Sequence, residues 1–104
     1  MRTLKIVDLA DQEFREATTY YHDRDPRVSE RFVAEARKTL QMMEQFPGIG
    51  APIPGVDDPM VRQVAIHKFP YNVVVDNFHE VRQVVAFAHK RKRPGYFVER
   101  IQRP

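Results

Sequence analysis

The sequence contains no cysteine, which excludes a disulfide framework, a zinc site with Cys ligands and catalysis by a thiol. It also lacks any apolar run near the roughly 18–20 residues that a membrane-spanning helix requires. The N-terminus has no apolar stretch long enough for a secretory signal, and the chain has neither internal repeats nor low-complexity tracts. With 104 residues, a single domain over 1–104 is predicted, and a soluble intracellular protein without a membrane partner is the expectation.

Negative charge is scarce in the second half of the chain. Residues 1–60 carry 8 Lys and Arg against 11 Asp and Glu, whereas residues 61–104 carry 9 against 3. A basic half on a small domain favours a polyanion or an acidic protein as partner, and composition does not choose between the two.

The first elements are predicted from apolar spacing. Residues 3–7 alternate apolar and polar types and predict a short strand. A helix over about residues 9–23 is predicted next, with the Asp8 carboxylate as its cap. The apolar face of this helix recurs at spacings of 4, 3 and 4 residues and consists of Ala10, Phe14, Ala17 and Tyr21.

A second helix is predicted from Pro26 to Phe46. Proline suits the first helical position, Asp25 is a good cap before it, and Pro47 with Gly48 ends the helix. The apolar stripe consists of Phe32, Ala36, Leu40 and Met43, flanked by Val33 and Phe46. The two helices are expected to form a helical hairpin, followed by a loop over residues 47–59.

Three more strands are predicted over residues 61–67, 71–77 and 81–88, and their short connections require antiparallel neighbours. The run 73–75 of three valines indicates a central strand that is covered on both faces. The fold class is therefore α+β, a helical hairpin packed on a small antiparallel sheet in the order β-α-α-β-β-β. Residues 94–104 leave room for a short C-terminal helix with an inner side of Tyr96, Phe97, Arg100 and Ile101.

The densest polar segment directly follows the last predicted strand. It begins at His89 and continues with four consecutive cations, Lys90, Arg91, Lys92 and Arg93. Lys and Arg at a strand end can hold phosphates, and His89 can exchange a proton near neutral pH. Tyr96 can stack or form a hydrogen bond. A solvated turn that keeps a basic protein soluble is the alternative interpretation.

The order of several motifs resembles the RelE/ParE toxin superfamily of bacterial type II toxin–antitoxin systems. The motifs are Asp8-Leu9, Asp25-Pro26, Phe46-Pro47-Gly48-Ile49-Gly50, Val61-Arg62-Gln63-Val64, Phe69-Pro70-Tyr71 and His89-Lys90-Arg91-Lys92-Arg93-Pro94-Gly95-Tyr96-Phe97. The resemblance covers essentially the whole chain, and the last two motifs are its most specific pair. It implies a strand–helix–helix–three-strand fold, a cytoplasmic bacterial protein and a cognate antitoxin in a hetero-oligomeric complex.

The resemblance leaves two toxic activities open. RelE-like members cut mRNA in the ribosomal A site without a metal, whereas ParE-like members poison DNA gyrase. The two lysines and the arginine that RelE-like enzymes place on their strands fall here at Gln63, Ala65 and Asn72, so three charges are missing. One preorganised donor of this kind is worth about 10²–10³ in rate. The resemblance therefore favours ParE-like inhibition of gyrase.

The alternative is a ribosome-dependent, metal-free mRNA endonuclease related to YoeB. It would use His89 for proton transfer, Arg91 and Arg93 on the phosphate, and Tyr96 to position a base. A third interpretation, a non-toxic nucleic-acid-binding module, has only Tyr96 and Phe97 as stacking aromatics among the cations.

Six cations are expected to contact the target or the acidic residues of an antitoxin: Arg62, Lys68, Lys90, Arg91, Lys92 and Arg93. The amphipathic part of the antitoxin, partly disordered when free, is expected on apolar surface of the hairpin and the sheet edge. No cofactor and no metal are expected, because His22, His67 and His79 lack the spacing or acidic company of a metal site.

Overall fold

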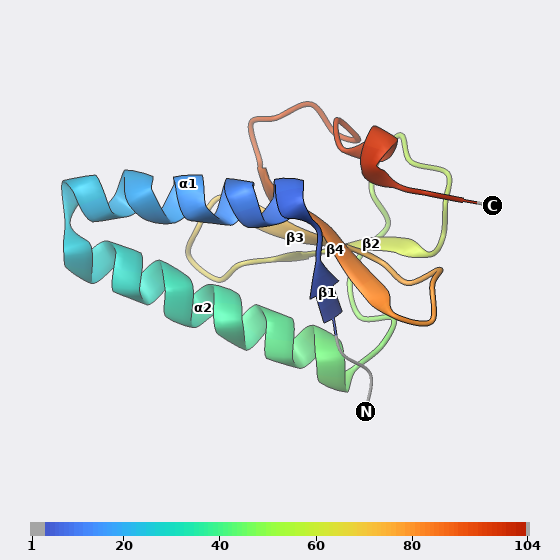
Figure 1. Ribbon diagram of the computed structural model, residues 1–104, viewed down its shortest axis with the longest axis horizontal. Coiled ribbons are helices and arrows are strands. Elements are labelled where there is room, and N and C mark those ends of the chain that lie inside the picture. The colour runs from blue at the N-terminus through green and yellow to red at the C-terminus, as the bar shows by residue number, and fades with distance from the viewer. Residues whose placement is uncertain (1–3, 104) are drawn as a thin grey trace.

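The computed structural model describes residues 4–103 and contains one sheet, two long helices and a C-terminal 3₁₀ turn (Figure 1). The elements are β1 (Leu4–Ile6), α1 (Asp8–Arg24), α2 (Pro26–Gln45), β2 (Val61–Ala65), β3 (Tyr71–Asp76), β4 (Arg82–His89) and η1 (Val98–Arg100). The predicted α+β class and element order are confirmed. Residues 3 and 104, at the outer ends of the predicted first strand and C-terminal segment, lie outside the described residues.

The four strands lie in the order β1-β4-β3-β2. The pairs β2–β3 and β3–β4 are antiparallel, as their short connections predict. Strand β1 pairs in parallel with β4, so the sheet is mixed instead of wholly antiparallel. Short connections require antiparallel neighbours, but β1 and β4 are not joined by one, because both helices and two strands separate them along the chain.

The two helices begin differently from one another. The Asp25 carboxylate accepts the Arg27 N–H at 3.0 Å, which confirms Asp25 as the cap of α2. Asp8 is not the cap of α1 but its first residue, and Val7 occupies the cap position without a side-chain bond. The reason is that the sheet extends to Val7, whose N–H donates to the Val84 carbonyl at 3.1 Å.

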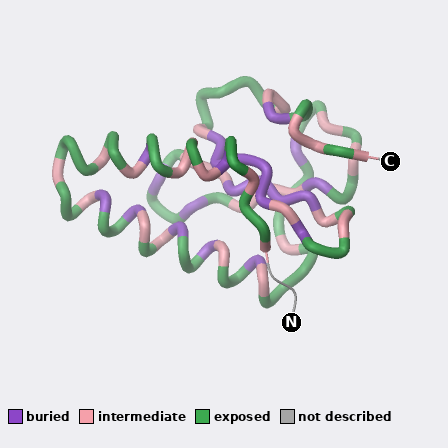
Figure 2. Tube along the Cα trace, in the orientation of Figure 1, coloured by how far each residue is buried: buried purple, intermediate pink, exposed green. Residues whose placement is uncertain are grey.

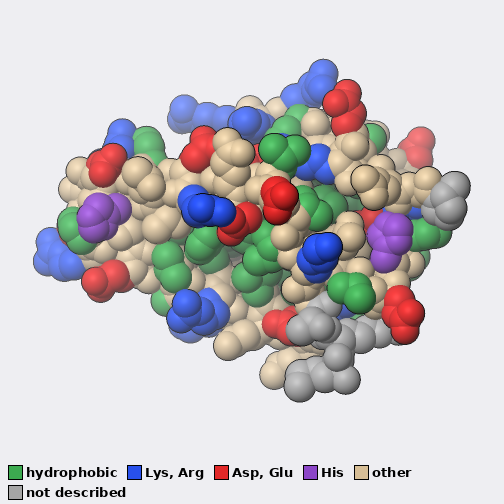
Figure 3. Space-filling model, viewed as in Figure 1, with side chains coloured by type: hydrophobic (Ala, Val, Ile, Leu, Met, Phe, Trp, Pro, Cys, Tyr) green, Lys and Arg blue, Asp and Glu red, His purple; other side chains and the backbone are tan. Residues whose placement is uncertain are grey.

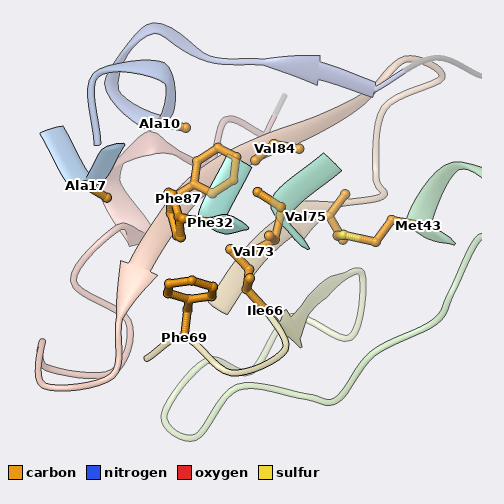
Figure 4. Packing of buried hydrophobic residues seen from close by; sticks show 11 residues of the cluster. Ala10, Ala17, Phe32, Met43, Ile66, Phe69, Val73, Val75, Val84 and Phe87 are labelled. Atoms are coloured by element: carbon orange, nitrogen blue, oxygen red, sulfur yellow. The ribbon is translucent and has the colours of Figure 1, made fainter. Parts of the chain in front are cut away.

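A first hydrophobic core lies between the helical hairpin and the sheet (Figure 4). Its centre is Phe32, which is fully buried. The ring centroids of Phe14, Tyr21, Phe69 and Tyr71 lie 5.1 to 5.6 Å from that of Phe32. The predicted apolar faces of both helices are therefore confirmed, except that Phe46, expected to flank the stripe of the second helix, lies after α2 and is exposed. Phe69 of the motif 69–71 packs against both helices through Tyr21 and Phe32.

A second core covers the opposite face of the sheet. It joins β2, β3 and β4 to the loop after α2 and to Phe97 of the C-terminal segment. In the β3–β4 register, Val74 pairs with Ala86 and Val75 with Val84, so Val85 is an extra residue in a β-bulge. The prediction of a central strand covered on both faces is confirmed, and the strands form the most buried part of the chain (Figure 2).

Gly50 brings the loop after α2 onto the edge of β2. Its φ of 112° favours glycine, and a Cβ there would lie 2.8 Å from the Gln63 carbonyl oxygen. The close approach lets Ala51 and Gln63 exchange two backbone hydrogen bonds of 3.0 Å each. The loop thereby covers part of the outer edge of β2.

The aromatic centre of the first core gives a test of stability. Phe32→Ala is expected to lower the free energy of unfolding by about 3–5 kcal/mol, because it removes a buried ring and leaves a cavity. Denaturant unfolding would measure the change. Phe46→Ala is the matched control, since Phe46 is 59% exposed and its loss is expected to cost under about 1 kcal/mol. Equal losses in the two variants would contradict the assignment.

Candidate functional site

Residues 90–93, called the basic segment from here on, run along the molecular edge beyond β4. Figure 3 shows Lys and Arg side chains gathered at the upper edge, where Figure 1 places the chain after β4. All four side chains are exposed. Within residues 4–103, none of the four forms an ion pair with a carboxylate, whereas Arg15, Arg27, Arg100 and Arg103 all do. The basic segment therefore presents uncompensated positive charge.

The backbone of the basic segment is tied to the β2–β3 hairpin and to His89. The Lys90 N–H donates to the Pro70 carbonyl at 2.9 Å, and the Lys92 N–H to the His89 carbonyl at 3.0 Å. The Arg91 N–H donates to Nδ1 of His89 at 3.0 Å. Exposed side chains thus stand on an ordered backbone.

Two of the predicted contact residues, Lys68 and Arg62, lie outside the basic segment, and only Lys68 is close to it. Lys68 is exposed in the hairpin turn just before Pro70, with a φ of 67°, so it belongs to the same end of the sheet. Arg62 lies in β2, next to Gln63, and donates to the carbonyls of Pro59 and Gly50 at 3.2 and 3.4 Å. It supports the loop instead of joining the basic segment.

A groove of about 690 Å³ separates α1 from the end of β4. One wall carries Glu13 and Glu16 of α1, and the other carries His89, Arg91 and Lys92. Tyrosines from α1 and β3 and the ring of Phe87 line the rest. The groove is therefore aromatic inside, with walls of opposite charge.

A smaller cavity of about 150 Å³ lies beside the basic segment and takes Gln63, Asn72, His89 and Tyr96 among its lining residues. The Asn72 amide donates to the Gln63 amide oxygen at 3.2 Å. These two positions are where RelE-like enzymes carry cations. Strands β2 and β3 thus contribute to this cavity two neutral amide side chains that are hydrogen-bonded to each other. The Lys and Arg side chains among the lining residues of the cavity are Lys90, Lys92 and Arg93.

Tyr96 is committed to an internal contact. Its hydroxyl donates to Oε2 of Glu13 at 2.5 Å. Burial, followed by this hydrogen bond, raises the pKa of Tyr96 well above its ordinary value. A phenol that keeps its proton and already donates to a carboxylate is not free to act as a general base. The expected role of Tyr96 in positioning a nucleobase depends on its ring and stays a prediction.

The partner of Tyr96 belongs to an ion pair, called the Glu13–Arg100 clasp below. Two guanidinium nitrogens of Arg100 donate to Glu13 at 2.8 and 3.2 Å. Arg100 also donates to the Val85 carbonyl at 3.0 Å, and Glu13 accepts the Phe87 N–H at 3.1 Å. The hydrogen bond to Glu13 raises the pKa of Arg100, so the cation is retained.

Sequence reasoning missed Glu13. The residue stands three positions after Ala10 and four before Ala17. At helical spacing these three residues share one face. A carboxylate between two small buried residues is the signal that predicts a buried partner for it.

A second arginine anchors the end of the described chain. Arg103 donates to both oxygens of Asp76 at 2.7 and 3.0 Å and also contacts Asp58. Asp76 is only 1% exposed, and it also accepts the Phe78 N–H. A backbone hydrogen bond from Met60, supported by Arg103, lowers the pKa of Asp58. With the Glu13–Arg100 clasp, three carboxylate–arginine contacts fasten the described C-terminal segment. It forms only the turn η1 and not the predicted α-helix.

Among residues 4–103, no group of three or more His, Cys, Asp and Glu is placed to hold a metal ion. In the same part of the chain, no helix is long and apolar enough to cross a membrane.

The helical hairpin on a small sheet, with a cationic segment beyond the last strand, is the arrangement expected from the resemblance to the RelE/ParE toxin superfamily. A family model described as "ParE toxin of type II toxin-antitoxin system, parDE" matches residues 4–94, so the chain belongs to the ParE toxin family. The fold is similar to a chain of the "Chromosomal ParDE TA system from P. aeruginosa", with a TM-score of 0.70 and 18% identity over 86% of this chain and 96% of that one. No curated protein sequence matches.

The clasp gives a second test of stability. Glu13→Ala is expected to lower the free energy of unfolding by about 3 kcal/mol, because it leaves a largely buried guanidinium, a phenol and the Phe87 N–H without their acceptor. Glu16→Ala, three residues further along α1 on the exposed surface, is the control and is expected to change stability by under about 0.5 kcal/mol. Denaturant unfolding measures both, and a Glu13 effect no larger than the control would refute the clasp.

The raised pKa of Tyr96 predicts a specific alkaline behaviour. Above the ordinary tyrosine pKa of about 10, the unfolded chain loses a proton that the folded chain keeps. The contribution of Tyr96 is therefore complete below pH about 10 and declines as the pH rises further. Tyr96→Phe should flatten the fall in unfolding free energy as the pH rises above about 10. Tyr20→Phe, at an exposed ring, should follow the parent, and identical curves for all three proteins would contradict the assignment.

Proposed function

We propose that this ParE-family toxin, when its antitoxin does not bind it, arrests bacterial growth by inhibiting DNA gyrase in the cytoplasm. The observation that carries the proposal is the combination of the family match with a neutral amide pair, Gln63 and Asn72, where a metal-free nuclease needs cations. Three missing charge-stabilising groups, each worth about 10²–10³ in rate, would remove several powers of ten from RNA cleavage.

The basic segment is the surface that we propose contacts the target. Its four side chains are exposed and have no carboxylate partners within the described chain, so forming a complex costs no internal ion pair. Gyrase acts on DNA, whose phosphates are a dense array of negative charge. Lys68, in the adjoining hairpin turn, extends the same surface, whereas Arg62 is assigned to the loop.

We further propose that the partner antitoxin supplies an acidic, amphipathic segment that is partly disordered when free. Exposed apolar side chains lie on α1 and at the β1 edge of the sheet, where Leu9, Tyr20 and Ile6 are 52%, 50% and 37% exposed. Acidic antitoxin residues would meet Arg91 and Arg93. Such a segment folds on binding and covers both kinds of surface in a toxin–antitoxin hetero-oligomer.

One observation favours the second candidate, a ribosome-dependent mRNA endonuclease. His89, Lys92, Arg93 and Tyr96 line one small cavity, which places a titratable imidazole beside cations. The commitment of the Tyr96 hydroxyl to Glu13 weighs against this candidate. A non-toxic nucleic-acid-binding module is the third candidate, and Tyr96 again limits it because its ring lies against Phe97 and is half-buried.

The decisive comparison removes the charge of the basic segment. A variant with Lys90, Arg91, Lys92 and Arg93 all changed to Gln is expected to lose toxicity. In a supercoiling assay with purified gyrase it should require at least about tenfold more protein for inhibition, since four exposed ionic contacts are lost. The control removes four exposed cations of α2 by changing Arg27, Arg31, Arg37 and Lys38 to Gln, and it should remain toxic.

The cellular process that fails first when the toxin is expressed identifies its activity. Both variants and the parent are expressed without antitoxin, and circular dichroism of the purified proteins confirms folding. Loss of plasmid supercoiling in the parent supports gyrase inhibition. If the parent protein instead causes cuts in mRNA while plasmid supercoiling stays normal, the mRNA endonuclease replaces gyrase inhibition as the proposed activity. If cells that express folded parent protein grow normally, both toxic activities are excluded.

A further inference from the structure

The imidazole of His89 contacts the backbone of the basic segment. His89 is the last residue of β4, and its ring lies edge-on to Tyr71 with the centroids 5.0 Å apart and an interplanar angle of 83°. Its Nδ1 accepts the Arg91 N–H at 3.0 Å. A backbone N–H only donates, so Nδ1 carries no proton and the neutral ring is protonated at Nε2.

This bond is the middle one of three consecutive backbone anchors. The amides of Lys90 and Lys92 donate to the carbonyls of Pro70 and His89, and the Arg91 amide between them donates to the imidazole. Four adjacent like charges repel one another, so an untied segment would spread through many conformations. Of the three acceptors only the imidazole changes its bonding capacity near neutral pH.

We propose that His89 is a positioning residue, which holds the basic segment in its target-binding arrangement through Nδ1 and releases the segment when the imidazole takes up a proton. A protonated Nδ1 carries a hydrogen and cannot accept the Arg91 N–H. The proposal rests on the proposed function, because it takes residues 90–93 as the target-binding surface.

The surroundings of His89 couple its protonation to movement of the segment. The titratable and charged groups that share its two cavities are Glu13, Glu16, Tyr20 and Tyr21 of α1, Tyr71 of β3, Tyr96 of the C-terminal segment, and the basic segment itself. Tyrosine side chains carry no charge near neutral pH, and Glu13 is already paired with Arg100. An imidazolium is therefore attracted by Glu16 and repelled by the basic segment, and departure of the segment relieves that repulsion.

Two substitutions separate the nitrogens of the ring. Asparagine places its amide oxygen near the position of Nδ1, whereas glutamine places its oxygen nearer Nε2. His89→Asn therefore keeps an acceptor for the Arg91 N–H and has no titratable group, and His89→Gln loses that acceptor. His22, which is exposed on α1, provides the matched control pair His22→Asn and His22→Gln.

Amide hydrogen exchange on the purified full-length chain tests the anchor directly. In the parent, protection of the Arg91 amide, corrected for intrinsic exchange, is expected to fall at least about fivefold between pH 8 and pH 5. His89→Asn should stay protected at both values and His89→Gln at neither. The proposal would be overturned if protection of the Arg91 amide in the parent did not change with pH, or if that amide stayed protected in His89→Gln.

Inhibition of gyrase at pH 8 tests the functional consequence. His89→Gln is expected to require about fivefold to tenfold more protein than the parent, and His89→Asn is expected to restore potency to within about twofold. The His22 variants should match the parent. If Asn and Gln at position 89 both abolish toxicity while the Arg91 amide stays protected, the imidazole itself performs chemistry and the positioning role is wrong. If the exchange pattern holds but the four-Gln variant of the basic segment stays toxic, the proposed target surface fails instead.

Discussion

The Glu13–Arg100 clasp closes an edge of the sheet that the backbone leaves open. Strand β1 pairs only with Arg82–Val84, so β4 continues beyond the end of its neighbour. Glu13 accepts the Phe87 N–H and Arg100 donates to the Val85 carbonyl, and two side chains thereby take the place of the missing strand. Buried backbone groups without partners would cost about 1–3 kcal/mol each. One ion pair therefore joins α1, the sheet and the C-terminal segment.

The clasp also determines what the rest of the site can do. Its Glu13 accepts the Tyr96 hydroxyl, so that phenol already has an internal partner. It fixes the chain on the far side of the basic segment, while His89 and Pro70 fix the near side. The short run of cations is held by its backbone at both ends, and the nearby Glu13 is already paired with Arg100, so the segment displays its positive charge on an ordered backbone. Such a surface suits recognition of a polyanion or an acidic protein better than catalysis.

The fold places the acidic and the basic half of the chain on opposite sides of one groove. The acidic first half includes α1, whose Glu13 and Glu16 form one wall of the large groove, and the basic second half supplies the opposite wall. The Asp25 and Arg27 pair stays at the exposed turn between the helices. A partner segment that enters the groove would therefore be oriented by charge as well as by the tyrosine rings between the walls.

Local sequence determined both helical faces, the Asp25 cap, the three antiparallel strands and the place of the cationic run, because each depends on residues within a turn or a hairpin of one another. The parallel pairing of β1, the displacement of the cap from Asp8 to Val7 and the bulge at Val85 were decided by the sheet as a whole. The role of Tyr96 depended on Glu13, which is 83 residues away along the chain. Residue spacing predicts only contacts between residues that are close along the chain. The hydrogen bond between Tyr96 and Glu13 forms only after α1, β4 and the C-terminal segment have packed together.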